Sequence, residues 1–174
     1  MAGIYIHIPF CKQACHYCNF HFSTSLRQKE ELIAALIAEI KITVPFTDDG
    51  LIETIYLGGG TPSLLSLSDI ENILHTIKEK FQVAASVEIT LEANPDDIHS
   101  LQLLEWRTAG INRLSIGIQT FLNDELIWMN RAHNAGQALD CIQLSRDAGF
   151  DNFSVDLIYG SPLLSNDDWK RNVD

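Results

Sequence analysis

Two ten-residue stretches decide the fold of this chain: AGINRLSIGI at residues 109–118 and AGFDNFSVDL at residues 148–157. Each stretch begins where a segment of helical period ends, passes a glycine and continues as an apolar strand. The repeat predicts βα units, and strands that are joined by helical crossovers form a parallel sheet. It is therefore typical of either a doubly wound sheet or a β/α barrel.

Working outward from this repeat, we expect five strands with helices between them. The strands are expected at residues 4–8, in a segment ending at 55–57, and at 87–91, 113–118 and 152–158. Helices are expected to start at capping boxes formed by Ser25 with Gln28 and by Ser68 with Glu71. A third helix is expected to open at Asn94-Pro95 and to close at Gly110.

Strand parity separates the two architectures, because side chains alternate between the faces of a strand. One face is apolar throughout: Ile4, Ile6, Ile8, Val87, Ile89, Leu91, Leu114, Ile116, Ile118, Phe153, Val155 and Leu157. The other face is polar: Tyr5, His7, Glu88, Thr90, Glu92, Ser115, Gly117, Gln119, Ser154 and Asp156. A sheet with helices on both faces would be apolar on both. We therefore predict an α/β fold with a parallel, barrel-like sheet of about five βα units.

The composition narrows the class of protein. The chain has 174 residues, of which 46% are hydrophobic, and this length suits one domain with a packed core. Its formal net charge of −11 argues against a nucleic-acid or anionic-membrane surface. We find neither an apolar run of membrane-spanning length nor a signal peptide, so we expect a cytoplasmic protein with reduced cysteines. Cys141 falls in a predicted helix and is expected in the core.

A cysteine-rich loop follows the first strand. Cys11, Cys15 and Cys18 form a C-x3-C-x2-C run, and thiolates this close can converge on one metal centre. Three ligands leave one position open, as on a cubane iron–sulfur cluster whose free iron binds a substrate. A zinc-binding interaction module, with His16 or His21 as the fourth ligand, is the alternative.

The cysteine run at the end of the first strand resembles that of the radical S-adenosylmethionine (SAM) enzymes. Further motifs are similar to one branch of that family, the oxygen-independent coproporphyrinogen III dehydrogenase-like proteins. These motifs are YIHIPFC at 5–11, GGGTP at 58–62, EANP at 92–95, GIQTF at 117–121 and DLIYG at 156–160. The resemblance covers nearly the whole chain. It implies that residues 1–174 are the N-terminal part of a radical SAM core domain, with a C-terminal domain outside this chain. The fold expected from the resemblance is therefore an incomplete parallel β/α barrel of about five βα units, truncated at the C-terminus.

The resemblance also implies cofactors and their sites. Cys11, Cys15 and Cys18 would each ligate one iron of a [4Fe–4S] cluster, and the fourth iron would hold SAM. An electron from the reduced cluster would then cleave the sulfonium, which is the cofactor's own chemistry. The residues that match SAM-contacting positions of the family are Tyr5, Tyr17, Gly59, Gly60, Thr61, Glu92, Gln119, Arg131 and Asp156.

One position departs from the dehydrogenase pattern, in which a fourth cysteine follows as C-x3-C-x2-C-x-C. Phe20 stands there in this chain. The phenylalanine form resembles the sister group of heme chaperones, which implies heme binding and delivery to acceptor proteins, with a reducing electron donor as a further partner. The alternative is a working dehydrogenase that decarboxylates propionates through a 5′-deoxyadenosyl radical. The residues leave open whether radical chemistry is catalysed. The family's heme-binding motif is expected beyond residue 174.

Overall fold

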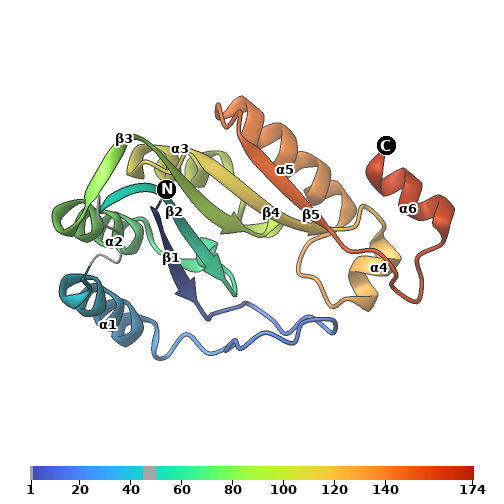
Figure 1. Ribbon diagram of the computed structural model, residues 1–174. Helices are drawn as coiled ribbons and strands as arrows, with labels where there is room; N and C mark the ends of the chain where they lie inside the picture. The colour runs from blue at the N-terminus through green and yellow to red at the C-terminus, as the bar shows by residue number, and fades with distance from the viewer. Residues whose placement is uncertain (1, 45–49) are drawn as a thin grey trace.

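The computed structural model describes residues 2–44 and 50–174. Its centre is a five-stranded, wholly parallel sheet in which the strands follow one another in chain order, β1-β2-β3-β4-β5 (Figure 1). The strands are β1 (Ala2–Ile8), β2 (Leu51–Gly59), β3 (Gln82–Ala93), β4 (Arg113–Gln119) and β5 (Phe153–Leu157). A doubly wound sheet reverses its strand order at a switch point. The unbroken order therefore confirms the expectation of a partial, open β/α barrel.

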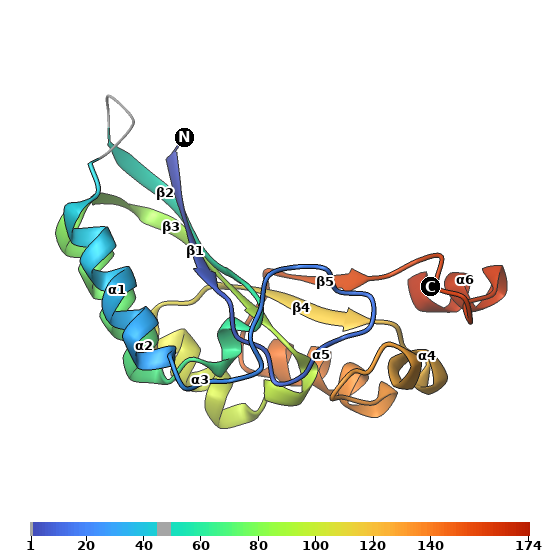
Figure 2. The same ribbon diagram turned by 90° about the horizontal axis from the view of Figure 1, so that it is seen from below.

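Helices cover one face of this sheet. They are α1 (Lys29–Ile42), α2 (Leu67–Lys80), α3 (Ser100–Ala109), α4 (Asn123–Trp128), α5 (Ala135–Asp147) and α6 (Asn166–Val173), with 3₁₀ turns η1 (Pro62–Leu64) and η2 (Pro95–Asp97). Figure 2 shows α1, α2, α3 and α5 along the same side of the sheet, while α4 and α6 lie near the ends of β4 and β5. The opposite face is left to loops.

The core lies between the sheet and these helices, as strand parity predicted. Ile8, Leu91, Leu114 and Ile116 are fully buried from the sheet side. From the helix side they meet a layer of apolar residues that includes Ile70, Ile73, Leu74, Ile77, Leu103 and Trp106. Burial of such side chains contributes roughly 1.5–3 kcal/mol each, which makes this layer the main source of stability. Cys141 of α5 belongs to it and is buried, as expected.

Helix starts differ from the expected capping boxes. The Ser25–Gln28 box is wrong: α1 begins at Lys29, and its N-cap residue Gln28 makes no side-chain capping bond. The second box is shifted by two residues, because Ser66 caps α2 and its reciprocal partner is Asp69. Serine-rich segments offer several such pairs, and the packing of the following helix selects among them.

The third helix also starts elsewhere. Asn94-Pro95 opens the short turn η2 rather than a long helix, and α3 begins at Ser100. Gly110 closes α3 with φ 107°, as predicted. In the described part of the chain, no helix is long and apolar enough to cross a membrane.

Candidate functional site

A cavity of about 560 Å³ opens on the helix-free face, at the carboxyl ends of the strands. Active sites of parallel β/α sheets form at this end. All twelve residues predicted as ligands or SAM contacts line this one cavity: Tyr5, Cys11, Cys15, Tyr17, Cys18, Gly59, Gly60, Thr61, Glu92, Gln119, Arg131 and Asp156. The structure thus brings together residues from five strands and three loops, while their individual roles stay predictions.

Hydrogen bonds hold the cysteine loop at its base and at its tip. At its base, Cys11 N donates to Ser23 O at 3.0 Å and Ser23 N donates to Pro9 O at 2.8 Å, which closes the loop. At its tip, His16 N donates to Met129 O at 3.1 Å. The side chain of Asn130 donates to Ala14 O at 2.8 Å. The loop therefore leans on the connection between α4 and α5 and holds its thiols over the end of the sheet.

Cys11, Cys15 and Cys18, the three loop thiols, are partly exposed and unpaired. Burial raises the pKa of Cys11, and the neighbouring thiols add to this effect, whereas a hydrogen bond from Thr61 and the charge of Arg131 oppose it. Among the described residues, no three ligand side chains gather closely enough to hold a single metal ion. A cubane cluster takes one thiolate on each iron, so its ligands need not meet at one point.

The glycine loop forms the wall beside these thiols. Gly59 has φ 116°, a conformation that favours glycine, and a Cβ there would lie 2.7 Å from His7 Nδ1. A Cβ on Gly60 would lie 2.6 Å from Phe10 O and 2.9 Å from Cys11 Sγ. Both glycines therefore allow β2 to approach the start of the cysteine loop more closely than any side chain would permit.

Glu92 reaches this loop from β3. Its carboxylate accepts hydrogen bonds from Tyr56 Oη at 2.8 Å and from Gly59 N at 3.0 Å, so it braces the glycine loop. Burial raises the pKa of Glu92, and the nearby charge of Asp156 adds to the rise, although the two hydrogen bonds oppose it. Burial and Glu92 together raise the pKa of Tyr56 to about 12. Asp156 is exposed in the cavity mouth and contacts Ser115 Oγ at 3.5 Å.

Arg131 is the cation of the cavity wall. Its Nη2 donates to Asn94 Oδ1 and to Gly117 O, both at 2.7 Å. Its Nη1 lies 3.3 Å from Tyr17 Oη and 3.5 Å from Cys15 Sγ. The sequence showed only that Arg131 lies in a loop, and this was equally compatible with a role on the surface and with a place in the site.

The remaining predicted residues complete the rim. The Tyr5 ring stacks on Tyr56 with centroids 5.8 Å apart, and its hydroxyl is 3.3 Å from His7 Nδ1. Gln119 ends β4 with φ 71°, at a register shift against β5. Phe20, which replaces the fourth cysteine, also lines the cavity and is 77% exposed.

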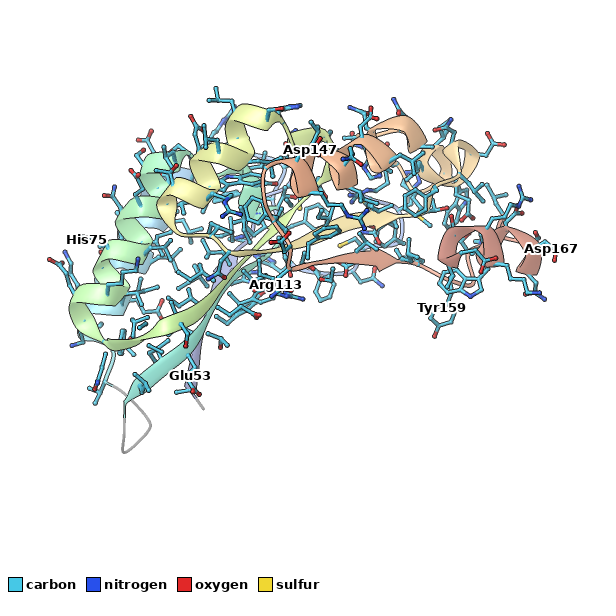
Figure 3. The ribbon with its side chains drawn as sticks, turned by 90° about the horizontal axis from the view of Figure 1, so that it is seen from above. Glu53, His75, Arg113, Asp147, Tyr159 and Asp167 are labelled. Carbon is cyan, nitrogen blue, oxygen red and sulfur yellow. The ribbon has the colours of Figure 1, made fainter. Side chains whose placement is uncertain are left out.

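Sequence reasoning missed Asn94 as a contributor to this site, and it also missed Arg113, which lies outside the cavity. Asn94 was expected only as a helix cap, but its side chain makes no capping bond and instead joins Arg131 to Thr61. Arg113, labelled in Figure 3, spans the polar face at the opposite ends of the strands by donating to Ser154 Oγ at 3.0 Å. The alternation that places Ser115 on that face also places Arg113 there, so strand parity could have found it.

Comparisons with known proteins agree with this geometry. The family model of the radical SAM superfamily matches residues 5–174. The heme chaperone HemW of Bacillus subtilis is 37% identical over 164 residues, which is 93% of this chain and 43% of that protein. The Escherichia coli heme chaperone HemW is 35% identical, again over 92% of this chain and 43% of its own length. The chain therefore spans less than half the length of these curated relatives.

Solved structures include a near match in shape. Coproporphyrinogen III oxidase (HemN) from Escherichia coli, described as a radical SAM enzyme, superimposes with a TM-score of 0.88 at 29% identity. The match covers 98% of this chain and 40% of that one. The cobalamin-dependent radical enzyme OxsB shares the fold at a TM-score of 0.61 and 15% identity.

Proposed function

The chain belongs to the radical SAM superfamily, and from that membership we propose that it binds a [4Fe–4S] cluster and SAM and serves as a heme chaperone in porphyrin metabolism. One observation carries the cofactor part of this proposal: a single cavity gathers the three loop thiols, the glycine loop and Glu92 at the ends of parallel strands. The supply of a cluster-bound electron to the SAM sulfonium is chemistry that the cofactors bring when bound.

The chemistry of the donor set fits such a group. Three thiols from one loop match the three cysteine ligands of a cubane with one open iron. The guanidinium of Arg131 lies beside Cys15 and offsets negative charge on the thiolates. Because Gly60 has no side chain, Cys11 can lie close against the end of the sheet. In this proposal Gly59, Gly60 and Thr61 admit the amino end of SAM.

The other predicted contacts complete the SAM site of the proposal. Tyr5, Tyr17, Glu92, Gln119, Arg131 and Asp156 surround the rest of the molecule. Glu92 is already engaged with Tyr56 and Gly59, so its role is to hold the glycine loop in shape as well as to face the ligand. Asp156 and Gln119 also line the cavity and bring a carboxylate and an amide to it.

The heme part of the proposal is supported by Phe20 and by the relatives. Phe20 stands where the dehydrogenase pattern has a fourth cysteine, and relatives at 34–38% identity carry the name heme chaperone HemW. The whole protein would bind heme and deliver it to acceptor proteins, with a reducing electron donor as a further partner. We place it in the cytoplasm, where its four unpaired cysteines remain reduced.

A second candidate is oxygen-independent coproporphyrinogen III dehydrogenase. The close superposition with coproporphyrinogen III oxidase favours it. An anaerobic assay of the full-length protein with coproporphyrinogen III, SAM and a reductant separates the two candidates, because only the dehydrogenase forms vinyl products. Heme titration of the same preparation, followed by its Soret band, tests the chaperone directly.

Iron and sulfide analysis of anaerobically purified protein tests the cofactor. About four irons and about four sulfides per chain support the cluster. One zinc without sulfide would replace the whole proposal by the zinc-binding interaction module. A SAM titration monitored by the electron paramagnetic resonance signal of the reduced cluster then tests the SAM site, because a ligand on the open iron changes that signal.

A further inference from the structure

Asn94 lies between two of the predicted cluster ligands without touching either. It follows β3 and is half-buried at the cavity wall. Its Oδ1 accepts from Arg131 Nη2 at 2.7 Å, and its Nδ2 donates to Thr61 Oγ1 at 3.3 Å. Each of these partners in turn reaches a cysteine: Arg131 reaches Cys15, and Thr61 reaches Cys11.

The chemistry of the partners leaves only one orientation for the Asn94 amide. A guanidinium has donors and no acceptor, so the amide oxygen must face Arg131. The amide nitrogen then faces Thr61, whose hydroxyl oxygen accepts from it. Because a hydroxyl carries a single proton, the Thr61 proton is left to point at the Cys11 sulfur. Asn94 therefore decides which way the Thr61 donor is aimed.

The same side chain aligns the second donor. Arg131 Nη2 is held by Asn94 Oδ1 and Gly117 O together, and this clamp turns Nη1 toward Cys15 Sγ. Thr61 itself is 4% exposed, so its hydroxyl has little access to solvent. Hydrogen bonds thus link Thr61 through Asn94 and Arg131 to Cys15. At the other end, Thr61 follows Gly60, where a Cβ would lie 2.9 Å from Cys11 Sγ, and the Thr61 hydroxyl opposes the burial-driven rise in the pKa of that thiol.

We propose that Asn94 is a positioning residue that aims one hydrogen-bond donor at the sulfur of Cys11 and another at that of Cys15, and thereby makes the bound cluster easier to reduce. The inference rests on the proposed cluster. Hydrogen bonds to the sulfur ligands stabilise the more negative, reduced form of an iron–sulfur cluster, which raises its reduction potential. Losing these bonds leaves less of the cluster reduced at a given potential.

Two uncharged substitutions of similar size test this role. Asn94→Leu removes both alignments, and Thr61→Val removes only the donor to Cys11. Each should lower the ratio of reduced to oxidised cluster at one fixed, buffered potential by at least about threefold, measured from the electron paramagnetic resonance signal. In the double variant, the ratio of reduced to oxidised cluster should fall by less than the product of the two single fold-changes, because Asn94 acts on Cys11 through Thr61.

Thr76→Val is the matched control, since Thr76 is equally buried but bonds only Asn72 O within α2. It should keep the wild-type ratio. Wild-type protein without iron would refute the proposed function itself. Wild-type protein with its cluster, beside a Thr61→Val variant whose ratio is unchanged, would overturn the proposal as stated, because the donor aimed at Cys11 would then have no effect on the cluster. That second outcome decides the matter even if Asn94→Leu fails to fold.

Discussion

Replacing Gly60 by alanine adds one methyl group at the tightest point of the cavity wall. The new Cβ would lie 2.6 Å from Phe10 O, 3.0 Å from Ile8 O and 2.9 Å from Cys11 Sγ. A hydrogen bond already holds the backbone at this position, because Gly60 N donates to Ile8 O at 2.8 Å. Two of the three clashing atoms are main-chain carbonyl oxygens, which cannot rotate away as the end of a side chain could.

The expected loss of stability in Gly60→Ala follows from the backbone atoms that must move. Contacts under 3.0 Å do not persist at a Cβ, so Phe10 and Cys11 must shift by several tenths of an ångström. Ile8 is fully buried and resists the movement, which leaves the cysteine loop to yield. Forced backbone shifts of this kind cost about 1–3 kcal/mol. We therefore expect Gly60→Ala to lose about 1–3 kcal/mol of the free energy of unfolding and to retain less iron.

Urea unfolding followed by circular dichroism measures the first effect, which should appear as a lower midpoint at an unchanged slope. Iron and sulfide analysis measures the second. Gly136→Ala in the first turn of α5 is the control, because its Cβ would meet only the Asn134 side chain, at 3.2 Å. Asn134 caps α5 by accepting from Gln137 N, so the control perturbs a helix end and no part of the cysteine loop. It should lose less stability than Gly60→Ala and should keep its iron.

A Gly60→Ala variant with wild-type unfolding free energy and wild-type iron content would refute this reasoning. It would show that the wall at Gly60 does not hold the cysteine loop. Equal iron loss in Gly136→Ala would count against it as well, because a Cβ at position 136 would contact none of the loop thiols.

Three further predictions concern the cysteines, His133 and Arg131. Alanine in place of any one of the three loop thiols should abolish the visible absorbance of the cluster in anaerobically purified protein, whereas Cys141→Ala should keep it; loss with Cys141→Ala alone would make the ligand assignment wrong. Burial, helped by the charge of Arg131, lowers the pKa of His133 to about 4, so the folded state binds its proton less readily than the unfolded state, in which the pKa is about 6.5. Wild-type unfolding free energy should therefore fall by up to about 3 kcal/mol as pH drops from about 6.5 to about 4, and His133→Gln should lose that dependence in urea titrations at each pH. Arg131→Met should destabilise the protein by about 1–3 kcal/mol, because Asn94 Oδ1 and Gly117 O lose their donor; an unchanged thermal midpoint would contradict this.

Local pattern determined the architecture, and the resemblance to a known family supplied the individual site residues. The alternation of Leu114 and Ile116 with Ser115 and Gly117 showed which face of β4 meets helices, because adjacent side chains on a strand must point to opposite sides. Parallel strands end at one edge, so motifs that follow different strands had to converge. The twelve residues taken from the resemblance accordingly line a single cavity, even though positions 5 and 156 are far apart in the chain.

Only the tertiary structure decided how these residues are held. Asn94 reads locally as a helix cap, but its amide is used by Thr61 and Arg131, which arrive from other segments. Glu92 reads as a ligand, but its oxygens already bond Tyr56 and Gly59. The sequence determined which groups meet, because period and strand direction are local properties. Their hydrogen-bond partners depend on distances between segments, and those distances are set only when the helices pack on the sheet.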